Sequence, residues 1–164
     1  MKLPSGRKAI LLLGLPLGLA VGGALAYTQL ASGSAPPPEV PDPSPGQQGV
    51  MLALDDRVIN LAAGGAYRYA KIGVTIELRP ESKDFYTLAG EGRATSQKTI
   101  IADYDKDLPV LLDKLGTVVG AKTSDELSKP DGRAALKKEL LDSFRSVLGE
   151  KDVIDIFFTD LVMQ

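Results

Sequence analysis

The 164-residue sequence contains neither histidine nor cysteine, two side chains that often act as nucleophiles, general bases or metal ligands. Their absence excludes a Ser-His-Asp or Cys-His nucleophile, a zinc site and a haem attachment site. It also excludes disulfides and a lipid anchor on cysteine, so the folded part must rely on its hydrophobic core. Any catalytic function would have to use carboxylates alone, and we predict no cofactor, no metal and no catalytic residue.

Charged side chains are also absent from Ala9 to Pro38, and the stretch Ala9 to Ala26 is almost wholly apolar. As a helix this stretch would be about 27 Å long, close to the roughly 30 Å hydrocarbon core of a bilayer. Basic residues precede it and acidic residues follow it, so the positive-inside rule keeps the amino terminus in the cytoplasm. We therefore predict a cytoplasmic segment at 1–8, a transmembrane helix at 9–27 and an exported remainder.

A cleaved signal peptide is the alternative, because Ala24-Leu25-Ala26 fits the small-x-small cleavage pattern. The apolar stretch is longer than the about 7–15 residues of a usual signal core, which favours a retained anchor. The domain that follows is exported in either case.

Small residues recur every four positions in the apolar segment, at Gly14, Gly18, Gly22 and Ala26. This spacing places them on one face of a helix, where two helix backbones can approach closely in lipid. The pattern predicts a packing face for a second copy or for a partner's membrane helix, although glycine is frequent in membrane helices in any case.

A proline-rich linker is predicted at 28–49, with six prolines between Ser32 and Gly49. Such a composition cannot bury a core and favours extended polyproline geometry, so it serves as a semi-rigid spacer with a reach of at most roughly 50–60 Å. A proline-rich ligand for a binding module is the alternative.

Residues 50–164 are long enough for one compact domain. Their slightly acidic balance, sixteen Lys or Arg against nineteen Asp or Glu, argues against nucleic acid or anionic lipid as the partner of this domain. Strict alternation of apolar and polar residues predicts a half-buried strand over 69–78. A preceding strand at 57–61 would join it through Gly64-Gly65, and the apolar residues 153–163 predict an inner strand covered on both faces.

Helical periodicity begins at Ile100 and ends at Gly120, but Pro109 interrupts it. The helix therefore either starts near Pro109, with Asp107 as its cap, or bends there. A further helix is predicted over 130–148, stopped by Gly149. Its inward positions are expected to be Leu136, Leu140, Phe144 and Val147. Together these elements predict an α+β fold, a small mixed or antiparallel sheet packed by two to three helices.

Three acidic features of the sequence resemble functional sites. Asp103, Asp105 and Asp107 imitate the start of a calcium loop, but the sixth and twelfth positions of that loop are Leu108 and Lys114, so calcium is rejected. Gly90-Glu91-Gly92 lacks the rest of a phosphate loop and is expected to be an exposed turn in an insertion over 81–97. Asp160 lies inside an apolar strand, so it should be exposed at an edge or hydrogen-bonded by a neighbour such as Thr159.

Several segments, in order, resemble the family of flagellar basal-body-associated FliL proteins. They are the strand Tyr69 to Leu78, the stretch Lys122 to Ser128, the stretch Pro130 to Arg133, and the C-terminal strand Phe158, Thr159, Asp160, Leu161, Val162, Met163 and Gln164. The resemblance covers about residues 55–164 and the arrangement of segments before them. The segment at 81–97 is longer than the corresponding segment of the family pattern.

The resemblance implies a single-pass inner-membrane protein of the bacterial flagellar motor with a periplasmic domain at 50–164. That domain would have a stomatin-type (SPFH) fold and form a homo-oligomeric ring around the MotB part of the MotA/MotB stator, supporting torque, swimming and swarming. Two other functions stay open on the residues alone. One is an exported enzyme that uses two facing carboxylates, and the other is a membrane-tethered ligand-binding module with a deep apolar pocket.

Overall fold

The computed structural model of the chain describes residues 43–150 and 152–164. The predicted segments 1–8 and 9–27, the packing face of Gly14, Gly18, Gly22 and Ala26, and most of the linker at 28–49 lie outside the described residues. Within residues 43–150 and 152–164, no helix combines the length and the apolar composition needed to cross a bilayer.

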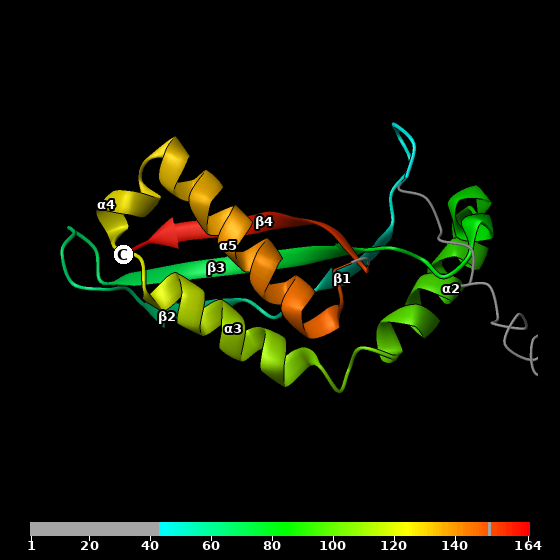
Figure 1. Cartoon of the computed structure of the whole chain (residues 1–164), viewed down its shortest axis with the longest axis horizontal. Helices are drawn as coiled ribbons and strands as arrows, with labels where there is room; N and C mark the ends of the chain where they lie inside the picture. The colour runs from blue at the N-terminus through cyan, green and yellow to red at the C-terminus, as the bar shows by residue number, and fades with distance from the viewer. Residues whose placement is uncertain (1–42, 151) are drawn as a thin grey trace, which may run out of the picture. The chain divides into compact units, whose positions relative to one another are not determined.

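One antiparallel sheet organises the domain around its central strand β3, Tyr69–Leu78. Along one edge, β3 pairs first with β2, Arg57–Asn60, and then with β1, Val50–Ala53. Along the other edge it pairs with β4, Val153–Met163, over nearly its whole length (Figure 1). The two strands predicted at 57–61 and 69–78 are thus confirmed, and so is their hairpin connection, in which Gly64 has a positive φ of 122°.

Helical segments fill the chain between β3 and β4. They are the 3-10 helix η1 Lys83–Thr87 and the α-helices α2 Gly90–Ala102, α3 Leu108–Gly120, α4 Ser124–Leu127 and α5 Pro130–Leu148. In Figure 1, α3 and α5 lie across the same face of the sheet. They also pack against each other, while α3 contacts β2 and α5 contacts β4. The predicted α+β class, with an antiparallel sheet, is therefore confirmed.

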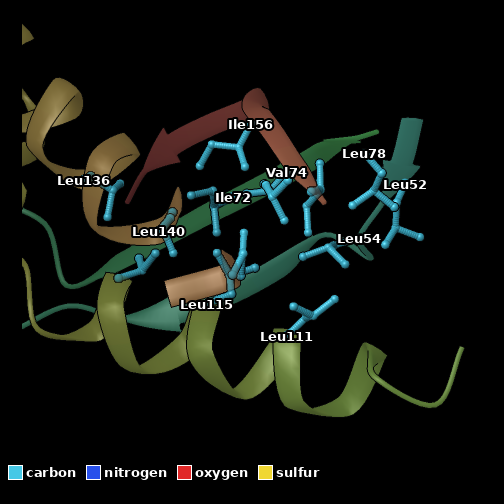
Figure 2. Close-up of a cluster of buried hydrophobic side chains, with 14 of the residues drawn as sticks. Leu52, Leu54, Ile72, Val74, Leu78, Leu111, Leu115, Leu136, Leu140 and Ile156 are labelled. Carbon is cyan, nitrogen blue, oxygen red and sulfur yellow. The ribbon is translucent and has the colours of Figure 1, made fainter. Parts of the chain in front are cut away.

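The hydrophobic core lies between this helical layer and the sheet, as Figure 2 shows. Alternate residues of β3 point into it, as their period of two predicts. On the helices the buried positions are spaced by three or four residues, as expected for one helix face. The main core side chains are Ala70, Ile72, Val74, Ile76 and Leu78 from β3, Leu111, Leu115 and Val119 from α3, and Leu136, Leu140 and Phe144 from α5.

Proline and glycine set the ends of the two core helices. Pro109 is in the first turn of α3, where its missing N–H would have had no helical partner, so the helix starts there and does not bend. Asp107 precedes this helix, but its side chain makes no capping hydrogen bond. The predicted bounds of α5 are confirmed, and Gly149 ends it with a φ of 113°, a conformation that favours glycine.

The prediction of a turn at Gly90-Glu91-Gly92 is wrong, although these three residues are exposed as expected. The segment 81–97 contains η1, and Gly90 begins α2. Tertiary contacts override the glycine-rich composition. The Arg93 guanidinium donates to the Gln48 carbonyl at 2.6 Å and lies 4.5 Å from the centre of the Phe85 ring.

The final strand has its predicted bounds, but the prediction that both its faces are covered is wrong. Strand β4 is an edge strand, and only Val153 and Ile156 in it are buried. Phe157 remains 41% exposed and Val162 46% exposed. Among the described residues the helices that cover the sheet lie on one face, so apolar residues that point to the other face stay in contact with solvent.

Two short elements have no counterpart in the sequence-based expectations. Strand β1 is only four residues long, and helix α4 has a single turn. Helix α4 begins with a capping box, in which Thr123 Oγ1 accepts from the Glu126 amide and the Glu126 carboxylate accepts from the Thr123 amide. The Thr123 amide and the Thr123 hydroxyl both donate to the Glu126 carboxylate, and these two hydrogen bonds lower its pKa from the usual value.

Candidate interaction surface on the helix-free face of the sheet

The face of the sheet that points away from α3 and α5 gathers four large exposed apolar side chains. They are Val58 of β2, Tyr69 of β3, and Phe157 and Val162 of β4, with exposed fractions of 70%, 48%, 41% and 46%. Strand register brings them together, because Val58 and Val162 both lie beside Lys71 on opposite sides of β3. We call this surface the helix-free face.

A three-residue ion cluster occupies the centre of the helix-free face. Lys71 Nζ lies 2.7 Å from a carboxylate oxygen of Asp56 and 2.7 Å from one of Asp160. The hydrogen bonds to Asp160 and Asp56 raise the pKa of Lys71 above its usual value, so Lys71 stays charged throughout the physiological range. Asp160 is therefore paired, as expected for a carboxylate in an apolar strand, but the side chain that bonds it is Lys71 of the adjacent strand and not the neighbouring Thr159.

Gly73 provides the space in which this cluster sits. A methyl group at position 73 would collide with Thr159 Oγ1 and with a carboxylate oxygen of Asp56. A register shift of the sheet at Gly73/Val74 accommodates Thr159 as an extra residue of β4 next to Asp160. The glycine and the bulge together allow two carboxylates to converge on one lysine.

Replacing Gly73 with alanine should therefore lower the free energy of unfolding by about 1–2 kcal/mol, because the new methyl group overpacks the cluster. Chemical denaturation of the purified protein, followed by far-UV circular dichroism, measures this change. Thr159→Ala in the same chain should recover part of the loss, since it removes one of the two colliding atoms. A double variant no more stable than Gly73→Ala would refute the steric explanation.

The other charged groups near this face also have partners. The Glu77 carboxylate accepts a hydrogen bond from the Gly49 amide at 2.7 Å. Lys137 reaches from α5 to Asp155 at 2.9 Å, and its ammonium lies 5.4 Å from the centre of the Phe157 ring. These four carboxylates and two lysines thus all have a hydrogen-bond or ion-pair partner.

The described residues show little that suggests chemistry. Within residues 43–150 and 152–164, no three or more Asp or Glu side chains gather as a metal site would require, and Asp103, Asp105 and Asp107 lie at the turn between α2 and α3. A hollow of about 130 Å³ lies in the loop between β2 and β3, lined by residues 61–65, 67 and 68. It is smaller than the roughly 300–1,000 Å³ of usual ligand pockets.

Within the C-terminal segment Phe158 to Gln164, Asp160 and Val162 lie on the helix-free face, whereas Phe158, Leu161 and Met163 pack against the core. Gln164 and Tyr69 exchange two backbone hydrogen bonds, of 2.8 and 2.9 Å, which fix the end of β4 beside the start of β3. The sequence points to this segment and to Asp160, but it does not show that Lys71, Asp56, Val58 and Tyr69 belong to the same surface. The period of β3 is the one indication in the sequence, because it places Tyr69 and Lys71 on the face opposite the core.

Comparison with known proteins identifies the family of this domain. The family described as "Flagellar basal body-associated protein FliL" matches residues 51–164, the whole sheet except its first residue and all the helices of the described chain. The chain belongs to the FliL family. It is also similar to the "Flagellar protein FliL" of Aquifex aeolicus (strain VF5), with 31% identity over 127 residues, which are 77% of this chain and 68% of that protein.

Membership in this family confirms the resemblance inferred from the sequence. FliL proteins are structural or accessory proteins of the flagellum, associated with the basal body, and do not form a known enzyme family. Association with the basal body fits a location at the membrane.

Proposed function

We propose that this protein is a structural and regulatory component of the flagellar motor that associates with the MotA/MotB stator and supports torque generation. The family match over residues 51–164 carries the proposal. The helix-free face supports it, because a surface with exposed aromatic and aliphatic side chains and paired charges is suited to contact another protein. In this role the domain acts through binding and not through chemistry.

We also propose roles for residues 1–49, which precede the domain. The apolar segment 9–27 spans the inner membrane once, with residues 1–8 in the cytoplasm, and Gly14, Gly18, Gly22 and Ala26 provide a face for close helix contact. The proline-rich linker 28–49 spaces the domain from the membrane. The domain lies in the periplasm and forms a homo-oligomeric ring at the stator.

Deleting the gene in its flagellated host should reduce the diameter of swimming halos in soft agar, because the stator loses a supporting partner. A plasmid copy of the full chain should restore swimming. A copy in which residues 1–27 are replaced by a cleavable signal peptide should not restore it, since the domain is then no longer held at the membrane.

Normal swimming of the deletion strain would refute the motor function. Fractionation of the tagged wild-type protein tests the topology separately, because a spanning helix keeps the full-length chain in the membrane pellet. Recovery of a shortened chain in the periplasmic extract would refute the anchor and favour the cleaved signal peptide.

A further inference from the structure

We propose that the 3-10 helix η1 and helix α2 form a clasp that closes over the point where the linker enters the sheet. In the closed state α2 is docked and β1 is paired with β3, and in the open state both are released together. All the contacts of the clasp lie within one chain. The clasp itself goes beyond the proposed function, whereas its role in bearing tension from a membrane anchor rests on that function.

The end of the linker is fixed at Gly49, directly before β1. The Gly49 amide donates to the Glu77 carboxylate at 2.7 Å, and Glu77, at 7% exposed, is the only buried charged side chain among the described residues. A methyl group at position 49 would collide with the Leu78 carbonyl oxygen, so the linker passes this close to β3 only because it has no side chain there.

Arg93 in the first turn of α2 holds the same stretch of backbone from the other side. Its guanidinium donates to the Gln48 carbonyl at 2.6 Å, and more weakly to the carbonyls of Gly49 and Phe85, each at 3.4 Å. It also lies 4.5 Å from the centre of the Phe85 ring, which is buried in the core. One guanidinium thus joins the linker, η1 and α2, which a lysine could not do because it lacks the planar fork of donors.

Helix α2 and the short strand β1 have few other attachments. None of the 13 residues of α2 is buried, and the helix packs against β1 beyond the layer of α3 and α5 (Figure 1). Ile100 and Ile101 hold its last turn partly against the core, while Arg93 holds its first turn. Strand β1 pairs with β3 over only four residues. Elements with few buried contacts open at low free energy, so losing the Arg93 contact should release both.

Tension on the linker would reach these contacts before it reaches the sheet. The linker enters β1 at Val50, which lies opposite Leu78 at the end of β3. Gln48 and Gly49 come directly before this first pair, so the hydrogen bonds from Arg93 and to Glu77 carry the load first. When they yield, α2 loses the same arginine contact. A pull on the linker would in this way be transmitted to α2.

Hydrogen exchange of the full-length protein in detergent, measured by mass spectrometry, tests the coupling. Arg93→Ala should speed exchange at least about tenfold in the peptides that cover β1 and in those that cover α2, because both lose a charge-assisted hydrogen bond. Arg93→Lys should give intermediate rates, since it keeps the charge and loses the fork. Lys98→Ala is the matched control on the exposed side of the same helix and should change neither rate.

The reverse experiment changes the linker and observes the helix. Gly49→Ala places a methyl group against the Leu78 carbonyl oxygen and touches no residue of α2, yet it should speed exchange in α2 by displacing the linker end. Coupling between two sites is reciprocal, so the linker must affect the helix if the helix affects the linker. Peptides from α5 should keep the wild-type rate in every variant, which shows that the fold persists.

Magnetic tweezers apply the tension directly. Handles are attached to the full-length chain at Ser44→Cys and Ser146→Cys, two exposed positions that provide the only thiols in a cysteine-free sequence. The first extension step on pulling should be the opening of the clasp. It should occur at lower force in Arg93→Ala and at the wild-type force in Lys98→Ala.

Two results would overturn the inference. One is faster exchange in α2 alone, with β1 as protected as in the wild type, which would make Arg93 a local anchor of the helix. The other is an Arg93→Ala variant with unchanged exchange and unchanged opening force. Both measurements use the isolated protein, so their outcome does not depend on the motor function. A coupled clasp in a protein whose deletion leaves swimming normal would keep this inference and remove the motor function.

Discussion

Replacing Phe144 with alanine should lower the free energy of unfolding by about 3–5 kcal/mol, the largest loss we expect from a single side chain. Phe144 lies in α5 with no exposed surface and is the largest fully buried side chain of the described residues. Its removal leaves a cavity between the helical layer and the sheet that the packed helices α3 and α5 cannot fill. Urea denaturation monitored by tyrosine fluorescence and circular dichroism measures the change.

Phe157→Ala is the matched control, because it deletes the same side chain at a position that is 41% exposed on the helix-free face. Its effect on the unfolding of a single copy should stay below about 1 kcal/mol, as for other surface positions away from the core. If Phe157→Ala destabilised the isolated fold as much as Phe144→Ala, Phe157 would belong to the core and could not be an available docking residue.

The contrast between these two phenylalanines also explains what could be predicted from the sequence. Period two along β3 and the apolar spacing of α5 identified the core correctly, because both patterns report a single buried face. In β4 the apolar residues occur on both faces, and composition cannot distinguish a second buried face from a surface that awaits a partner. The prediction of a doubly covered strand failed for that reason.

The ion cluster of Lys71, Asp56 and Asp160 shows a second reason why part of the surface cannot be predicted from the sequence. Asp160 could be identified as a carboxylate in need of a partner, but Lys71 is 89 residues away in the sequence. Only the register of β3 and β4, together with the bulge at Gly73/Val74, brings them together. Helix α2 escaped prediction because Gly90 and Gly92 are poor helix formers and because Arg93, which holds the helix to Gln48, is not recognisable as an anchor in the sequence.

The second large effect is expected at the junction of α4 and α5, where Gly132→Ala should lower the free energy of unfolding by about 3 kcal/mol or more. A methyl group at position 132 would collide with the backbone carbonyl oxygen of Glu126 and lie 2.7 Å from its carbonyl carbon. Backbone atoms cannot move aside as the end of a side chain can. The capping box of Thr123 and the hydrogen bond from Arg133 Nε to the Leu127 carbonyl hold that backbone in place.

Gly116→Ala in α3 separates this collision from the general effect of replacing a helical glycine. No atom lies within 4 Å of a methyl group at position 116, so this substitution should stabilise the protein by about 0.5–1 kcal/mol through helix propensity alone. Thermal unfolding of the two variants under identical conditions should shift the midpoint in opposite directions. A Gly132→Ala variant as stable as Gly116→Ala would show that α4 can move away from α5. The Ser124 hydroxyl of α4 accepts a hydrogen bond from the Tyr67 amide, in the loop between β2 and β3, at 3.1 Å. In that case the close packing of α4 against α5 would not be needed to hold this loop.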